Sequence, residues 1–234
     1  MRIIKFLYLA IPVCAITATQ CGCKKSNDKK ANCRIISATS TTAGNAYVFL
    51  YNNENKLIRT SLGSSVVTYD YSGNTTTVTN LDSGKFLNKS IVTNNADGLA
   101  INVRTETNTT GSEWSNTFYE YAGTELAKST FTSSAGGSAT VSTYVWTNGN
   151  LVSSKTDTTI SILDYYTDKT RQPGDFLSLV QVIQGYEIYR TRNLLKTASG
   201  TNLIYIFGTD GKIISLEAVS GTSTTILDYQ YQCN

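Results

Sequence analysis

From residue 33 onward, apolar and polar side chains alternate with a period of two. In residues 101–107, for example, the apolar and threonine positions fall on one face of an extended chain and the charged or amide positions on the other. This is the pattern of a half-buried antiparallel strand. β-Branched and aromatic residues dominate such runs, and Gly, Asn, Asp and Ser dominate the breaks between them. The alternation predicts a meander of many strands joined by hairpins.

A short phrase recurs along this meander. Each copy has two aromatic residues at positions i and i+2, a few turn residues and then an aliphatic residue. The copies run from Phe49-Leu50-Tyr51 to Leu57, from Tyr119-Glu120-Tyr121 to Leu126, from Tyr144-Val145-Trp146 to Leu151 and from Tyr205-Ile206-Phe207 to Ile213, and Tyr69-Asp70-Tyr71 shares the pair and the turn. Positions i and i+2 lie on one face of a strand, and Asn-Gly or Asp-Gly turns favour hairpins. Each phrase therefore predicts one hairpin corner.

One stretch, residues 173–185, departs from the two-residue period. Its apolar residues follow the spacing i, i+3, i+4, i+7 and are Phe176, Leu179, Val180 and Ile183. This spacing predicts a short helix with one apolar stripe. Asp175 is suited to cap the beginning of this helix, and Gly185 to end it.

The expected fold class is all-β, with residues 33–234 forming a single domain. We expect an antiparallel up-and-down meander of hairpins that curls into a closed or nearly closed soluble barrel, with one short helix near residues 175–184. A helix of about three turns is marginal alone in water. It should therefore lay its stripe on apolar strand surface or across the mouth of the barrel.

The first 22 residues have the pattern of an export signal. A basic start with Arg2 and Lys5 precedes an apolar run over residues 6–16 and then small and polar residues, and this run is too short to span a membrane. Cysteines follow at once, which predicts a lipoprotein signal over residues 1–22 with Cys23 as the lipidated residue and Cys21 as the alternative. Residues 23–32 then form a flexible tether. Simple secretion without a lipid anchor is the competing interpretation.

Cleavage before Cys23 leaves only Cys33 and Cys233 as further cysteines. They belong to the first and last strands of the meander, which become neighbours when a sheet closes on itself. An exported protein matures in an oxidising compartment. We therefore predict a Cys33–Cys233 disulfide, which requires a closed rather than an open sheet because the bond tolerates only about 4.4–6.8 Å between Cα atoms.

Charge argues against a nucleic-acid partner. The chain has 20 basic and 17 acidic residues, and removing the signal with its two basic residues leaves 18 against 17. No basic stripe appears along the chain, so we expect no nucleic-acid binding. Nothing in the sequence indicates a cofactor.

The sequence also argues against an enzyme. It contains no histidine, which removes the usual general base, every Ser-His or Cys-His pair and the commonest metal ligand. A carboxylate-dependent glycan hydrolase would need two acids at a fixed separation. Asp164 with Asp168 and Asp210 with Glu217 are available, but such residues are common at turns and surfaces. We expect neither a catalytic nor a metal site.

Several short motifs resemble a family of uncharacterised lipid-anchored proteins of the Bacteroidetes, known as a domain of unknown function with a porin-like fold. The motifs are Cys33, Asp164-Tyr165-Tyr166, residues 192–196 and the closing Tyr229-x-Tyr231-x-Cys233, and the aromatic phrases resemble YD-type repeats. The resemblance implies a strongly bent meander that closes on itself. It implies no activity.

Two classes of function follow. In the first, the protein is a non-enzymatic binding or scaffolding module, lipid-anchored to the outer membrane and facing the periplasm or the cell surface. Aromatic rows would then contact a glycan or protein partner, with Tyr119, Tyr121, Tyr144 and Trp146 as candidates. In the second, the protein is an outer-membrane pore. Residues 75–80 and 102–110 are too polar for the apolar outward face that such strands require, which favours the first class.

Overall fold

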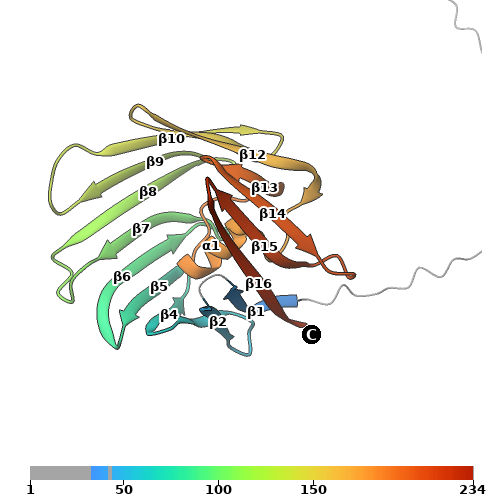
Figure 1. The fold of residues 1–234 in the computed structure, drawn as a ribbon. Helices are drawn as coiled ribbons and strands as arrows, with labels where there is room; N and C mark the ends of the chain where they lie inside the picture. Colours follow the sequence, from blue (N-terminus) through green and yellow to red (C-terminus); the bar gives the residue numbers. More distant parts are fainter. Residues whose placement is uncertain (1–32, 42–43, 234) are drawn as a thin grey trace, which may run out of the picture. The chain divides into compact units, whose positions relative to one another are not determined.

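The computed structural model describes residues 33–41 and 44–233, which contain sixteen strands and one helix. Each strand pairs antiparallel with its neighbours in the chain, and β1 pairs with β16, so the sheet is a closed up-and-down barrel (Figure 1). The elements are β1 (Cys33–Ser40), β2 (Ala46–Tyr51), β3 (Leu57–Leu62), β4 (Ser65–Ser72), β5 (Thr75–Asp82), β6 (Lys85–Asn94), β7 (Ala100–Glu106), β8 (Trp114–Ala122), β9 (Glu125–Ser133), β10 (Thr140–Thr147), β11 (Asn150–Thr156), β12 (Thr159–Thr170), α1 (Phe176–Gln184), β13 (Asn193–Ala198), β14 (Thr201–Phe207), β15 (Ile213–Ser220) and β16 (Ser223–Cys233). The expected all-β closed barrel with one short helix is confirmed.

The predicted disulfide closes the barrel. Cys33 and Cys233 face each other in the register of β1 and β16, and they are bonded with their Cα atoms 4.1 Å apart. The signal, the tether and the lipidation candidates Cys21 and Cys23 lie outside the described residues. Within the described part of the chain, no helix has the length and apolar character to span a membrane.

The aromatic phrases all lie at one end of the barrel. Phrases end strands β2, β4, β8, β10 and β14, and even-numbered strands of an up-and-down barrel run in the same direction. We call this end the aromatic rim, defined by residues Tyr51, Tyr71, Tyr121, Trp146, Tyr165, Phe207 and Tyr231.

At the rim, an aromatic side chain repeatedly donates a hydrogen bond to a backbone carbonyl of the preceding, adjacent strand. The donors and acceptors are Tyr51 to Ile35, Tyr71 to Leu57, Tyr121 to Ala100, Trp146 to Leu126, Tyr165 to Leu151 and Tyr231 to Ile213. Each acceptor residue is followed in its own strand by one residue that has no partner on one neighbouring strand, so the pairing register of the two strands shifts there. A β-bulge leaves a residue without its ladder partner. The second aromatic of the phrase therefore supports the bulge that follows the aliphatic residue of the previous phrase.

Side chains alternate between a packed interior and an exterior that carries polar, charged and apolar residues, with Val145 and Ile162 among the exposed apolar ones. Inward residues such as Phe49, Tyr69, Val78, Val92 and Leu203 form the hydrophobic core. The outward rows of most strands carry charged side chains: Arg59, Asp70, Lys89, Arg104, Glu106, Glu120, Lys128, Lys155, Asp164, Lys196, Glu217 and Asp228.

Residues 171–192 leave the wall between β12 and β13 and fill part of the barrel interior, with α1 lying within the ring of strands (Figure 1). We call this segment the plug. Asp175 caps α1 by accepting from the Ser178 backbone N–H at 2.9 Å, and Gly185 ends it in the left-handed conformation with φ 79°. Both predicted helix ends are confirmed.

The position of α1 was not fully anticipated. The helix is enclosed by strands rather than laid across the mouth, and its most buried residues, Leu177, Leu179 and Gln181, only partly match the expected stripe. Gln181 tolerates burial because its amide accepts from Arg171 and donates to the Tyr189 carbonyl.

Gly185 is expected to be essential for seating the plug. A Cβ at this position would lie 2.5 Å from the Tyr69 ring and 2.9 Å from Val78, in a backbone conformation with positive φ. Gly185→Ala should therefore lower the free energy of unfolding by about 2–4 kcal/mol, the sum of left-handed backbone strain and overpacking. Chemical denaturation measures this change.

Gly200→Ala is the matched control. Gly200 also has positive φ, at 86°, but a Cβ there meets nothing within 4 Å, so only the backbone cost of about 1–2 kcal/mol remains. Equal losses in the two variants would contradict the tight seating of Gly185 against the wall.

Candidate functional site

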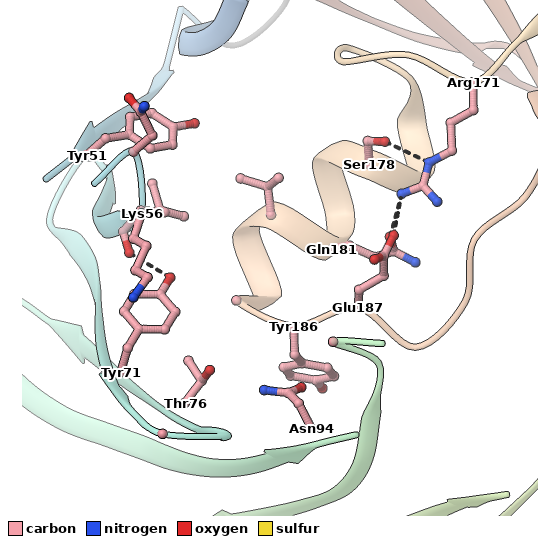
Figure 2. Close-up of a pocket in the computed structure, with 16 residues that line it drawn as sticks. Tyr51, Lys56, Tyr71, Thr76, Asn94, Arg171, Ser178, Gln181, Tyr186 and Glu187 are labelled. Carbon is pink, nitrogen blue, oxygen red and sulfur yellow. Dashed lines mark hydrogen bonds and ion pairs between the residues drawn. The ribbon is translucent and has the colours of Figure 1, made fainter. Parts of the chain in front are cut away.

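A cavity of about 530 Å³ opens at the aromatic rim between the plug and strands β2 to β6 (Figure 2). We call it the mouth pocket. Its lining residues are Tyr51, Asn55, Lys56, Leu57, Tyr71, Gly73, Thr76, Asn94, Gly98, Arg171, Ser178, Gln181, Val182, Gly185, Tyr186 and Glu187. Aromatic rings, amides, hydroxyls and a few charges thus meet in one concave site, which is the usual composition of a small-molecule pocket with orienting polar groups.

The barrel wall contributes tyrosine rings held in fixed orientations. Tyr51 donates its hydroxyl proton to the Ile35 carbonyl at 2.9 Å, and Tyr71 donates to the Leu57 carbonyl at 2.8 Å. Since the hydroxyls are used in the wall, it is the ring surface of Tyr71, 39% exposed, that remains for contact with a ligand. The Lys56 ammonium lies 5.6 Å from the centroid of this ring.

The plug contributes the opposite side of the pocket, organised by Arg171 (Figure 2). Its guanidinium donates to the Ser178 hydroxyl at 3.0 Å and to the Gln181 amide oxygen at 2.8 Å. It also pairs with Glu187 at 3.0 Å and lies 3.6 Å from the Asp175 carboxylate. Asp175 is only 1% exposed, and a buried carboxylate requires such partners. Arg171 therefore holds the plug in shape and is itself fully occupied.

The pocket tyrosines stay neutral at physiological pH. Burial raises the pKa of Tyr51, Tyr71 and Tyr186. Behind them, burial raises the pKa of Tyr69 to about 12, with the Thr60 hydrogen bond lowering it by less. Tyr69 donates to the Ile183 carbonyl at 2.7 Å, which joins the wall to α1. The formal charges that line the pocket are thus those of Lys56, Arg171 and Glu187.

The four aromatic residues singled out from the sequence lie in the barrel wall and do not line the mouth pocket. Tyr121 donates to the Ala100 and Ile188 carbonyls at 2.7 and 3.0 Å, and Trp146 donates to the Leu126 carbonyl at 2.8 Å. The Tyr144 hydroxyl is 2.9 Å from the Ser129 hydroxyl, and burial raises the pKa of Tyr119. All four side chains are partly buried; Tyr119 packs against the hydrophobic core, and Tyr121 joins the wall to the plug through Ile188.

The two candidate carboxylate pairs lie in separate settings. Asp164 faces outward and pairs with Lys196 at 3.6 Å, whereas Asp168 lines a different cavity of about 340 Å³ at the rim. Asp210 pairs with Lys212 in the turn before β15, whereas Glu217 lies on the outer face of β15 opposite Ile204. Among the described residues, no cluster of three or more acidic or cysteine side chains is placed to hold a metal ion.

Sequence reasoning missed most of the mouth pocket. Arg171, Tyr186 and Glu187 carry no local motif, because they become neighbours of Tyr71 and Asn94 only when the plug enters the barrel. The one available signal was the repeated phrase, which does supply Tyr51 and Tyr71.

The barrel is similar to solved structures of proteins described as porin-like. It superposes on the crystal structure of a porin-like protein from Bacteroides uniformis ATCC 8492 with a TM-score of 0.60 and 16% identity, covering 85% of this chain and 96% of that one. A porin-like protein from Bacteroides vulgatus ATCC 8482 matches with a TM-score of 0.58 and 14% identity, covering 84% and 98%. No protein-family model and no curated protein matches the sequence. At these identities the similarity shows the fold, which is that of the porin-like barrels.

Proposed function

We propose that this protein is an extracytoplasmic, non-enzymatic binding module that holds its ligand in the mouth pocket, and that it is attached to the outer membrane by a lipid on Cys23. The observation that carries the proposal is the combination of a packed interior with charged side chains on the outward rows of most strands. Both properties are opposite to those of a membrane channel.

The outward rows are the first support. A strand that crosses a bilayer presents an apolar outer face, and a lysine or arginine there costs about 2–4 kcal/mol at the midplane. Here Lys128 and Lys155 occupy outward positions on β9 and β11, and Glu120 faces Lys128 across the ladder at 2.6 Å. Charges of this kind recur around the barrel among exposed apolar side chains such as Val145 and Ile162, and each charge adds to the free-energy cost of inserting the barrel into a bilayer.

The plug is the second support. A channel needs a continuous water-filled lumen, whereas α1 places Leu177 and Leu179 in the same hydrophobic core as wall residues such as Phe49 and Leu203. At the rim, the plug is fastened to the wall by backbone hydrogen bonds, including Ala100 N–H to the Glu187 carbonyl at 2.8 Å.

The mouth pocket favours a polar ligand with flat apolar faces, such as a glycan. Sugars present such faces to aromatic rings and hydroxyls to amides, and the pocket offers Tyr71 and Tyr186 beside Asn94 and Gln181. A glycan array probed with the protein from Ser26 onward tests this ligand class. Tyr71→Ala should weaken a bound glycan about tenfold, whereas Ile162→Ala, at an outward position 67% exposed, should leave binding unchanged.

Membrane attachment is expected to depend on the N-terminal residues alone. The full-length protein should be acylated and should fractionate with membranes, whereas a protein beginning at Ser26 should be fully soluble without detergent. Fractionation followed by mass spectrometry of the N-terminal peptide measures both properties.

A pore is the second candidate, because the similar structures are described as porin-like. If the protein beginning at Ser26 needs detergent, or produces conductance steps in planar bilayers, the pore becomes the better explanation and the binding module is rejected.

A further inference from the structure

The seam between β1 and β2 is incomplete at the aromatic rim. Their register pairs Ser37, Ala38 and Thr39 with Val48, Tyr47 and Ala46 and stops there, although β1 begins at Cys33 and β2 continues to Tyr51. Side chains bridge the resulting gap. Tyr51 donates its hydroxyl proton to the Ile35 carbonyl at 2.9 Å, and the Arg34 guanidinium lies 4.5 Å from the centroid of the Tyr51 ring.

A cavity lies on each side of this gap. The inner cavity, of about 150 Å³, is formed between the strands and the plug and is lined mainly by apolar groups, among them Ile35, Phe49, Leu179 and Val182. The outer groove, of about 460 Å³, includes the exposed side chains of Val48 and Leu50. Arg34, Phe49 and Tyr51 line both spaces, so the two cavities are neighbours across the gap.

Within residues 33–41 and 44–233, Arg34 has no carboxylate partner. Its guanidinium donates to the side-chain oxygens of Gln232 and Asn55, which are neutral. Across the described residues, no carboxylate is within ion-pair distance of Arg34, whereas Arg104 and Arg190 each pair with one and Arg171 pairs with two. Arginine binds carboxylates through paired hydrogen bonds. A guanidinium that has only neutral hydrogen-bond acceptors among the described residues, beside a mainly apolar cavity, is therefore complementary to an anion with an apolar tail.

We propose that the gap between β1 and β2 binds a medium-chain fatty carboxylate, with its carboxylate on Arg34 and its tail in the inner cavity. A cavity of this size holds about six carbon atoms. The exposed Val48 and Leu50 side chains of the outer groove provide the approach from solvent. This site is distinct in chemistry from the mouth pocket, and it stands whether or not that pocket binds a polar ligand.

Calorimetric titration of the protein from Ser26 onward, which retains every described residue, tests the site with three probes. Octanoate should bind, acetate should bind at least tenfold more weakly because it lacks the tail, and octanol should bind about tenfold more weakly because it lacks the charge. Added salt should weaken the binding of octanoate but not the binding of octanol.

Two variants locate the site. Arg34→Gln keeps hydrogen-bonding capacity but removes the charge. It should therefore weaken the binding of octanoate about tenfold and leave the binding of octanol unchanged. Val182→Phe should fill the inner cavity and abolish binding of both probes. Arg59→Gln, at an outward position on β3, is the control and should behave like the unaltered protein. Circular dichroism and melting curves establish that each variant is folded.

Several results would overturn the proposal. They are the absence of octanoate binding, equal affinity for octanoate and octanol, undiminished octanoate binding by folded Arg34→Gln, or undiminished binding by folded Val182→Phe. Octanoate binding does not decide glycan binding in the mouth pocket, which Tyr71→Ala tests separately, although Tyr51, Ser178 and Val182 line both cavities.

Discussion

Removing the disulfide with Cys33→Ser and Cys233→Ser together should lower the free energy of unfolding by up to about 5 kcal/mol. The bond spans a sequence separation of 200 residues, so it restricts the unfolded chain over nearly the whole domain. For a domain of this size, such a loss corresponds to a melting temperature lower by about 10–20 °C. Differential scanning calorimetry of the protein from Ser26 onward measures it.

The reduced form of the unaltered protein provides the control. Adding reductant should bring its melting temperature to that of the double variant and should not change the double variant. If peptide mapping without reductant found free thiols at both positions, the covalent closure of β1 on β16 would be disproved. A double variant as stable as the oxidised protein would show instead that the backbone ladder between β1 and β16 closes the barrel unaided.

Trp146→Ala is expected to destabilise the barrel by about 3–5 kcal/mol. The indole contributes buried area inside the wall, and its N–H donates at 2.8 Å to the carbonyl of Leu126, a residue with 0% exposure. Loss of the ring leaves both a void and an unpaired buried carbonyl. The unpaired carbonyl alone should lower the free energy of unfolding by about 1–3 kcal/mol. Denaturation followed by tyrosine fluorescence measures the change.

Two further variants divide this effect. Trp146→Phe keeps most of the ring but removes the N–H, so it should retain the packing and show only the cost of the unpaired carbonyl. Trp114, the other tryptophan, lies outward on β8 beneath Arg104, whose guanidinium is 4.7 Å from the ring. Trp114→Ala should therefore cost only about 1 kcal/mol. Near-normal stability of Trp146→Ala would contradict a structural role for the aromatic phrase and would make Trp146 a ligand-binding candidate again.

The aromatic phrases specify the local structure of each hairpin but not which face of the sheet is buried. The spacing of Tyr144 and Trp146 specifies that both face the same side of a strand, and the Asn148-Gly149 turn specifies a hairpin, since both residues have positive φ, 53° and 77°. Neither pattern specifies whether that side is the interior or the exterior of a barrel. Closure decides this, because only the closed sheet has an inside.

The sequence by itself determined the elements of this protein: the strands from their two-residue period, the ends of α1 from Asp175 and Gly185, and the disulfide from the positions of Cys33 and Cys233. Each of these rests on local stereochemistry or on the pairing of only two positions. The tertiary structure alone decided that residues 171–192 enter the barrel and that Arg171 and Glu187 meet Tyr71 in the mouth pocket. These contacts join segments far apart in the chain, and their free energy comes from burial and from hydrogen bonds that exist only after the barrel has closed.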